Sequence, residues 1–277
     1  MNTQDIRLIA LDLDGTLLNS KKQLSPRNLA ALTRAAELGI EIVPATGRFY
    51  GGLPEAVRAL PFLHYAVTIN GAFVCGLPAG APIYKAEIPW RDAVSLLRYL
   101  DEWGVVYDCY ADNAAWITAS MKARIQEYVR DPIYLGLIQR LREPVEDLAA
   151  FLTARELDVQ KVQVYPGDPE KRLALLRAMP EAFPAMLATS SIAENVEINA
   201  AAANKGQALL ALAAHLGLRP EQTMAFGDGL NDVTMLRDAG VGVAMGNASD
   251  EIRALADVVT ASCDEDGAAQ VIEQLLL

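Results

Sequence analysis

Two aspartates stand one residue apart directly after an apolar run near the start of the chain. Asp12 and Asp14 follow the segment IRLIAL, and Gly15 comes directly after them. The alternation of side chains along a strand points both carboxylates to the same side. Two like charges held this close repel each other unless a cation joins them. The pair is therefore either a metal-binding site at a strand end or a pair of ordinary turn residues.

Three further polar stretches each follow or precede an apolar run. PATGR places Thr46 and the amide of Gly47 before a helix, where both can donate hydrogen bonds to an oxyanion. NKG places Lys205 at a helix start, which disfavours a cation unless it faces an anion. GDGLNDVTML puts Asp228 at a strand end and Asp232 one helical turn later, between flanking glycines. Taken singly, these stretches are also compatible with a strand-to-helix turn, a solvated lysine and a helix cap.

Taken together, these residue types describe phosphoryl transfer. Asp12, Asp14 and Asp228 can gather oxygen ligands around a hard cation, for which Mg²⁺ is the natural choice. Lys205, Thr46 and backbone amides can surround a phosphoryl group. Asp12 could attack phosphorus and form an aspartyl-phosphate. Asp14 could then protonate the leaving oxygen and later deprotonate water.

The elements that must position these residues alternate between strands and helices at both ends of the chain. This alternation predicts an α/β fold with a Rossmann-like parallel sheet core and helices on its faces. Strands are expected over residues 6–14, 40–48, 65–70, 223–229, 241–245 and 257–260, and helices over 25–39, 49–60, 204–218, 231–240, 249–256 and 265–277.

The middle of the chain has a different character and contains all three tryptophans. We interpret it as a separate α+β domain inserted into the sheet domain, with loops at both junctions. The sheet domain then comprises residues 1–81 and 192–277, and the insert comprises residues 82–191. Within the insert, helices are expected over 92–103 and 169–179, and strands over 105–110, 115–118, 159–165 and 184–189.

Composition limits the kind of partner. The formal net charge of −11 argues against nucleic acid, because binding a polyanion needs a basic surface. No apolar run approaches a membrane span, and the first residues, MNTQDIRL, lack the regions of a signal peptide, so we expect a cytoplasmic protein. The three cysteines lie far apart and suggest neither disulfides nor a zinc site. The expected partner is a small-molecule phosphate ester, and the expected state is a monomer or a weak homodimer.

The motifs DLDGTLL, ATGR, NKG and GDGLNDVTML, in this order, resemble the four motifs of the haloacid dehalogenase (HAD) superfamily of phosphatases. The insert after the second motif, and the ending VGVAMGNAS with ADVVTASCDEDGAA, are similar to the Cof-type branch with its C2B cap. The resemblance covers nearly the whole chain. It implies a HAD-like core with an α/β cap domain, and a Mg²⁺-dependent phosphatase of small phosphorylated metabolites, often sugar phosphates.

The resemblance also implies roles for the four aspartates. Asp12 would be the nucleophile and a Mg²⁺ ligand, and Asp14 the acid and base whose backbone carbonyl also meets the metal. Asp228 would ligate Mg²⁺, and Asp232 would orient the water molecules around the metal.

Five other residues would hold the phosphoryl group by the same resemblance, and one would lie at the edge of the site. The phosphate-binding residues would be Leu13 through its amide, Thr46, Gly47, Lys205 and Asn231, and the residue at the edge would be Asn70. The alanines that precede Asn204 depart from the more frequent glycine-containing approach to this lysine.

Two alternatives of other classes remain open. A phosphotransferase such as a hexose-phosphate mutase shares the nucleophile but returns the phosphoryl group to a sugar, which product analysis in labelled water would reveal. A non-catalytic module that binds phosphometabolites would release no phosphate, although it would have no need of all four acidic positions.

Overall fold

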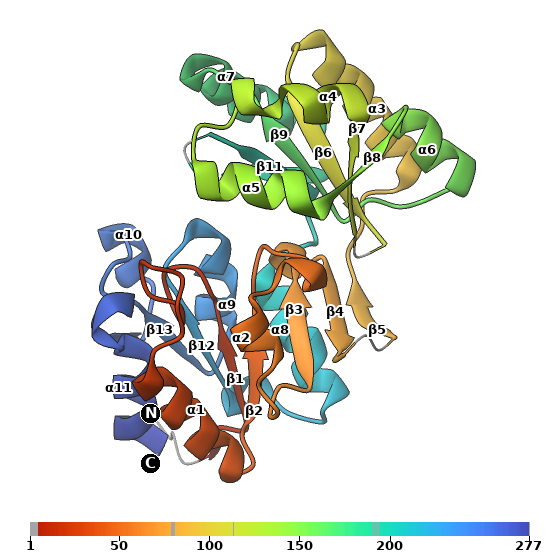
Figure 1. Cartoon of the computed structure of the whole chain (residues 1–277). Helices are drawn as coiled ribbons and strands as arrows, with labels where there is room; N and C mark the ends of the chain where they lie inside the picture. The colour runs from red at the N-terminus through yellow and green to blue at the C-terminus, as the bar shows by residue number, and fades with distance from the viewer. Residues whose placement is uncertain (1–4, 79–80, 113, 191, 193, 277) are drawn as a thin grey trace. The chain divides into compact units, whose positions relative to one another are not determined.

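The computed structural model describes residues 5–78, 81–112, 114–190, 192 and 194–276, which form two compact units (Figure 1). Unit 1 comprises Met1–Arg48, Leu53–Lys85 and Ala203–Leu277, and unit 2 comprises Phe49–Gly52 and Ala86–Ala202. The predicted α/β class with a parallel sheet core is confirmed.

The limits of the units differ from the boundaries expected from the sequence. Residues 82–85, expected in the insert, form a strand of unit 1, and residues 196–200, expected in the sheet domain, form a strand of unit 2. Residue 191, where the insert was expected to end, lies outside the described residues. The difference arises because a strand belongs with the sheet to which it is hydrogen-bonded, whatever loop precedes it.

Unit 1 is built on a five-stranded sheet in which every pairing is parallel. Its order is β14-β13-β12-β1-β2, so that β1 lies between β12 and β2. The strands are β1 (Leu8–Leu11), β2 (Glu41–Pro44), β12 (Thr223–Gly227), β13 (Val241–Ala244) and β14 (Val258–Val259). All four residues of β1 are buried, as expected for a strand covered on both faces.

A second, antiparallel sheet of unit 1 has the order β3-β4-β5. It consists of β3 (Tyr65–Thr68), β4 (Phe73–Gly76) and β5 (Pro82–Lys85). We expected residues 65–70 to extend the parallel sheet, but β3 meets it through a single bridge, between Ala45 and Val67. The strand turns away to pair with β4, because only the four residues from Ile69 to Ala72 separate the two strands and impose a hairpin.

Helices of unit 1 pack on both of its sheets. They are α1 (Pro26–Glu37), α2 (Glu55–Arg58), α8 (Lys205–His215), α9 (Val233–Asp238), α10 (Asp250–Arg253) and α11 (Gly267–Leu276). Helix α1 begins as its sequence predicts, with Ser25 accepting a hydrogen bond from the amide of Asn28 and Pro26 in the first turn. Apolar side chains of α8 and α9 join those of the strands in one core cluster.

Unit 2 is built on a six-stranded sheet of order β10-β11-β9-β6-β7-β8, in which only β7 and β8 pair in parallel. Its strands are β6 (Val106–Ala111), β7 (Ala114–Thr118), β8 (Arg142–Val145), β9 (Lys161–Tyr165), β10 (Met186–Thr189) and β11 (Val196–Ala200). Its helices are α3 (Trp90–Glu102), α4 (Ala119–Arg124), α5 (Pro132–Leu141), α6 (Leu148–Arg155) and α7 (Pro169–Ala182).

The two faces of the unit 2 sheet differ in chemistry. One face joins apolar side chains of β6, β9 and β11 to those of α3, α6 and α7 in the main core of the unit, against which all three tryptophans pack. The other face carries buried charged and polar side chains on the alternate positions of the same strands. No helix within the described residues is both long and apolar enough to cross a membrane.

Candidate active site

Asp12 and Asp228 leave the parallel sheet at the same edge. Asp12 follows β1, and its amide donates a hydrogen bond to the carbonyl of Phe226 in β12 over 3.0 Å. Asp228 directly follows β12. Because parallel strands present their carboxyl ends at one edge, the two carboxylates emerge together there.

Gly15 allows the turn after β1 to approach Asp228. Its φ of +95° lies in the region that favours glycine, and a Cβ at this position would lie 2.4 Å from Asp228 Oδ2. The next residue, Thr16, donates a hydrogen bond from its hydroxyl to Asp228 Oδ1 over 2.9 Å. The glycine of this motif is therefore required by the position of a carboxylate more than two hundred residues later in the chain.

Lys205 joins two of the carboxylates. It is the first residue of α8 and its side chain is fully buried. Its Nζ donates to Asp12 Oδ1 over 2.6 Å and to Asp232 Oδ1 over 2.5 Å. A lysine at a helix start is tolerated here because it faces two anions.

The three carboxylates of Asp12, Asp228 and Asp232 form a cluster that could hold a metal ion, with one oxygen from each within 4.8 Å of the others. Asp232 already accepts hydrogen bonds from Lys205 and from the amides of Asp228, at 3.0 Å, and Gly229, at 2.9 Å. Its lone pairs are largely committed, so Asp12 and Asp228 are the better direct ligands. An all-oxygen donor set of this kind suits a hard divalent cation such as Mg²⁺.

The cluster carries an excess of negative charge, and the pKa values reflect this. Burial, together with the charges of Asp232 and Asp228, raises the pKa of Asp12 to about 8, although Lys205 opposes the shift. Burial and the charge of Asp232 raise the pKa of Asp228 to about 6. Burial alone would lower the pKa of Lys205, but the two carboxylates outweigh it and raise that pKa. A bound divalent cation would relieve the repulsion among the carboxylates.

The side chain of Asp14 contacts two basic residues, Arg48 and Lys22. Its Oδ2 accepts from Nε of Arg48 over 2.8 Å, and its Oδ1 accepts from the second guanidinium nitrogen over 2.9 Å. Lys22 Nζ lies 3.0 Å from the same Oδ1. Burial alone would raise the pKa of Asp14, but the hydrogen bonds and charge of Arg48, with those of Lys22, hold this pKa below its usual range. Arg48 and Lys22 thus hold the carboxylate of Asp14 in a fixed orientation.

The residues predicted around the phosphoryl group lie on neighbouring turns of unit 1. Thr46 follows the bridge between Ala45 and Val67, is buried, and accepts on its carbonyl a hydrogen bond from the amide of Asn70 over 3.0 Å. Asn70 Oδ1 in turn accepts from Asn231 Nδ2 over 3.2 Å. A Cβ at Gly47 would lie 2.7 Å from Asn70 Oδ1. Thr46, Gly47, Asn70 and Asn231 therefore form one connected group.

The remaining predicted residue, Leu13, has a buried side chain between Asp12 and Asp14, and its carbonyl accepts from the amide of Leu18 over 2.8 Å. Its predicted role rests on its amide, which the contacts of the side chain do not test. The alanines that precede Asn204 do not disturb the loop before Lys205, since Asn204 caps α8 by accepting a hydrogen bond from the amide of Gln207. A Cβ at Gly71 would lie 2.3 Å from the carbonyl oxygen of Asn204, so this loop packs closely on the turn that contains Asn70.

Sequence reasoning did not assign Arg48, Lys22 or Asn247 to the site. Asn247 Nδ2 donates to Asp228 Oδ2 over 3.2 Å and to the carbonyl of Gly15 over 2.9 Å, so it ties two motifs together. Its position just after β13, at the same edge of the sheet, was the available signal. Arg48 belongs to the ATGR motif itself, and its charge directly after a candidate oxyanion-binding turn was the other signal.

Unit 2 holds buried charges of its own. Arg142 Nε donates to Asp108 Oδ2 over 3.0 Å, and Tyr165 donates to the same oxygen over 2.8 Å. Lys161 and Glu197 form a second buried ion pair, at 3.0 Å. Asp108 Oδ1 is buried and accepts no hydrogen bond from any described residue. Buried ion pairs contribute little to stability unless every polar atom is satisfied, so this face is not explained by folding alone.

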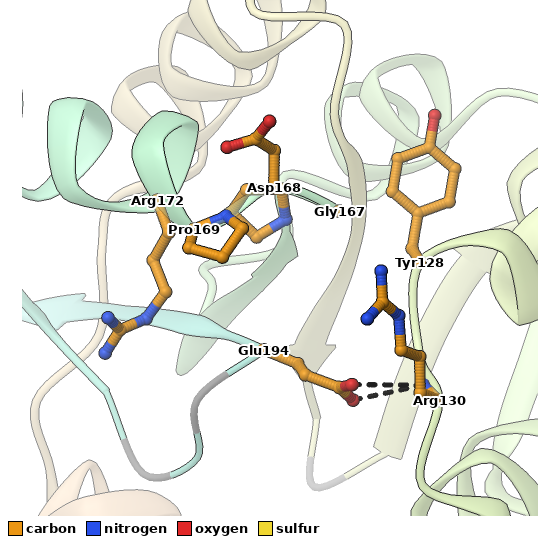
Figure 2. A pocket seen from close by; sticks show the side chains of 8 residues that line it. Tyr128, Arg130, Gly167, Asp168, Pro169, Arg172 and Glu194 are labelled. Atoms are coloured by element: carbon orange, nitrogen blue, oxygen red, sulfur yellow. Dashed lines mark hydrogen bonds between the residues drawn. The ribbon is translucent and has the colours of Figure 1, made fainter.

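A cavity of about 210 Å³ lies in unit 2, beside the first turn of α7, and Figure 2 shows the side chains that line it. The Glu194 carboxylate points toward Arg130 and accepts two hydrogen bonds from its amide, at 3.1 and 3.3 Å, whereas the guanidinium of Arg172 turns away from it (Figure 2). Asp168 caps α7 and occupies its first free amides. The cavity is lined only by residues of unit 2 and contains none of the predicted site residues.

Comparison with known proteins points in one direction. Residues 9–272 match the family described as haloacid dehalogenase-like hydrolase. The chain is similar to Phosphatase YwpJ of Bacillus subtilis, with 32% identity over 98% of this chain and 100% of that protein. It is also similar to Pyridoxal phosphate phosphatase YbhA of Escherichia coli, with 30% identity over 98% of this chain and 99% of that protein. Among solved structures, a sugar phosphatase of HAD subclass IIB matches with a TM-score of 0.81 and 25% identity, over 97% of this chain and 98% of the other.

Proposed function

The chain belongs to the family of haloacid dehalogenase-like hydrolases, and on that premise we propose that it is a Mg²⁺-dependent phosphatase of small phosphorylated metabolites, sugar phosphates among them, acting through an aspartyl-phosphate. The similar proteins named above support the reaction type, since two are named phosphatases and the third a sugar phosphatase. Their names also differ in substrate, which supports a broad class of small phosphate esters rather than one compound.

The observation that carries the proposal is the environment of Asp12. Its carboxylate follows β1, an inner strand of the parallel sheet, lies in a cluster with Asp228 and Asp232, and is held by the buried ammonium of Lys205 at 2.6 Å. A carboxylate held in a fixed place beside positive charge can attack phosphorus, because the charge attracts the dianionic substrate and offsets repulsion between the two anions.

Asp12 and Asp228 would hold the metal ion together with the backbone carbonyl of Asp14, and Asp232 would orient its water molecules. When bound, Mg²⁺ supplies positive charge that stabilises the phosphoryl oxygens during transfer. The remaining contacts to those oxygens would come from Lys205, the hydroxyl of Thr46, the amides of Leu13 and Gly47, and Asn231.

In the first step an oxygen of Asp12 forms a bond to phosphorus as the bond from phosphorus to the leaving oxygen breaks. Asp14 gives its proton to that oxygen, so the alcohol leaves neutral. In the second step Asp14, now ionised, takes a proton from water while the water oxygen attacks the aspartyl-phosphate. Inorganic phosphate leaves, the carboxylate of Asp12 is restored, and Asp14 is protonated again.

We assign selection of the substrate to unit 2, as the cap of this enzyme. Every residue given a part in phosphoryl transfer belongs to unit 1, which leaves unit 2 without a part in the chemistry. Its buried polar sheet face and its cavity provide the hydrogen-bonding groups that recognition of a polar leaving group needs.

The test combines two variants with a trapping experiment. Asp12→Asn should lower kcat to below about 1% of wild type, a loss of at least ~3 kcal/mol, because an amide cannot act as the nucleophile. Asp14→Asn, assayed with an activated aryl phosphate, should accumulate the aspartyl-phosphate, since the second step loses its base. Mass spectrometry of the acid-quenched protein should then find a phosphoryl group on Asp12.

The control is Asp250→Asn, which changes a carboxylate that is 92% exposed and should leave kcat at the wild-type value. If Asp12→Asn had the wild-type melting temperature but kept more than about 1% of the wild-type kcat, the nucleophile assignment would be contradicted. Phosphate transferred to a second sugar, with no oxygen from labelled water, would instead indicate a mutase.

A further inference from the structure

Arg48 holds the carboxylate of Asp14 through two hydrogen bonds, a geometry that a point charge such as an ammonium would not provide. Two hydrogen bonds, at 2.8 and 2.9 Å, join two nitrogens of the guanidinium to the two oxygens of Asp14. A planar fork of this kind fixes the plane of the carboxylate as well as its position. Lys22, whose side chain is 52% exposed, adds a single contact at 3.0 Å and cannot fix that plane.

The backbone of Arg48 is itself anchored within unit 1. Its amide donates to the hydroxyl oxygen of Thr46 over 3.2 Å, and its carbonyl accepts from the amide of Ile69 over 3.0 Å. On its own loop, between β1 and α1, the side chain of Asp14 is held by Lys22 through one contact at 3.0 Å, so the planar fork comes from the turn that carries Arg48. The direction of the Asp14 carboxylate is therefore set by the turn that carries Thr46.

We propose that Arg48 is a positioning residue that aims Asp14 at the leaving oxygen of the substrate. The inference rests on the proposed function, in which Asp14 gives its proton to that oxygen as the bond to phosphorus breaks. Arg48 takes no part in the proton transfer itself and returns to the same pairing when Asp14 is ionised again. Its removal leaves Asp12, Lys205 and the metal ligands in place, so attack on phosphorus survives while protonation of the leaving group fails.

This division gives a measurable signature in the leaving group. An alcohol or sugar needs a proton as it leaves, whereas dinitrophenolate is stable as an anion and needs none. The quantity to measure is kcat/KM, which covers the reaction only up to formation of the aspartyl-phosphate and so excludes the later role of Asp14 as a base. A residue that merely bound phosphate would affect all leaving groups by the same factor.

The experiment measures kcat/KM of the Mg²⁺-loaded enzyme for a hexose phosphate, phenyl phosphate, 4-nitrophenyl phosphate and 2,4-dinitrophenyl phosphate. Arg48→Ala should lose about 100-fold with the hexose phosphate and less than about threefold with the dinitrophenyl ester, as expected for loss of a general acid. Arg48→Lys should show the same trend with a smaller loss, since it restores charge without the fork. Retained activity on the dinitrophenyl ester also shows that each variant is folded.

The control is Arg34→Ala, which removes an exposed arginine paired with Glu37 at 3.1 Å and should match wild type on all four esters. An equal loss on every ester for Arg48→Ala, or wild-type values for Arg48→Lys, would overturn the positioning role. The proposed function is judged separately, on wild-type turnover and on Asp12→Asn, so either conclusion can fail without the other.

Discussion

Replacing Lys205 by methionine removes the ammonium that joins the buried carboxylates of Asp12 and Asp232. Methionine fills similar volume, so the change is mainly one of charge. Each contact, at 2.6 and 2.5 Å, represents ~6 kcal/mol of gross attraction at an effective dielectric constant of about 20. Most of this is offset by the desolvation of the charges, and loss of one partner of a buried pair typically destabilises by about 3–5 kcal/mol.

The loss should depend on pH in a definite direction. Without Lys205, the pKa of Asp12, which burial already raises to about 8, rises further, because the lowering influence is gone. A group whose pKa is raised on folding stabilises the protein below its unfolded pKa, and this stability is lost as pH rises through the folded pKa. Lys205→Met should therefore be destabilised by about 3–5 kcal/mol at about pH 8 and by clearly less at about pH 5.

Urea unfolding in the presence of a chelator measures both values, with Lys21→Met, which removes an exposed lysine, as the control. Addition of Mg²⁺ should recover part of the loss at about pH 8, because the ion supplies charge beside Asp12, while kcat should stay at least about 100-fold below wild type. A free energy of unfolding for metal-free Lys205→Met within about 1 kcal/mol of the wild-type value at about pH 8 would refute the reasoning.

Three further outcomes are expected. Gly15→Ala should lower Mg²⁺ affinity measured by calorimetry, because its Cβ would lie 2.4 Å from Asp228 Oδ2, whereas Gly39→Ala, with φ of +80° but nothing within 4 Å, should cost stability without changing that affinity. Burial raises the pKa of Asp228 to about 6, so the contribution of this group to the metal-free melting temperature should fall as pH rises from about 4.5 to about 7. The increase in melting temperature on adding Mg²⁺ should grow over the same interval, because the ionised carboxylate binds the metal. An equal increase at both pH values would argue against Asp228 as a ligand. Folded variants from a scan of polar and aromatic positions between residues 90 and 189 should change kcat/KM unequally across a sugar-phosphate panel, by ~1–3 kcal/mol each, and one common factor for all substrates, a small aryl phosphate included, would contradict the assignment of selection to unit 2.

The convergence of the carboxylates was predictable because it follows from strand direction. Apolar runs that end in Asp12 and Asp228 imply parallel strands, and parallel strands bring their carboxyl ends to one edge. The pairing of Lys205 with Asp232 was less accessible, since both lie at helix starts and a long side chain can reach several partners. The fork between Arg48 and Asp14 depends on rotamers, which sequence spacing does not determine.

The limits of the insert were harder to predict for a different reason. The strand at residues 196–200 has alternating apolar residues that suit either sheet, and only its pairing with β9 and β10 decides. Strand β8 carries Pro144, which argues against a central strand, and the structure places it at the edge of its sheet. A parallel neighbour reached through α4 and α5 leaves no local signal of its own.

The segment Phe49–Gly52 affects how this protein could be recombined with its relatives. It groups with unit 2 although unit 1 flanks it on both sides, so the chain passes between the units after Arg48, Gly52, Lys85 and Ala202. The ring of Phe49 packs edge-on against Tyr110 of β6, with 5.5 Å between centroids, and is only 8% exposed. A chimera that exchanged residues 86–202 alone would therefore present Phe49 to a foreign surface, directly beside the arginine that holds Asp14. Grafting a new specificity onto this scaffold requires both pieces of the inserted unit to come from one parent. Otherwise the incoming sheet needs an aromatic residue at the position equivalent to Tyr110.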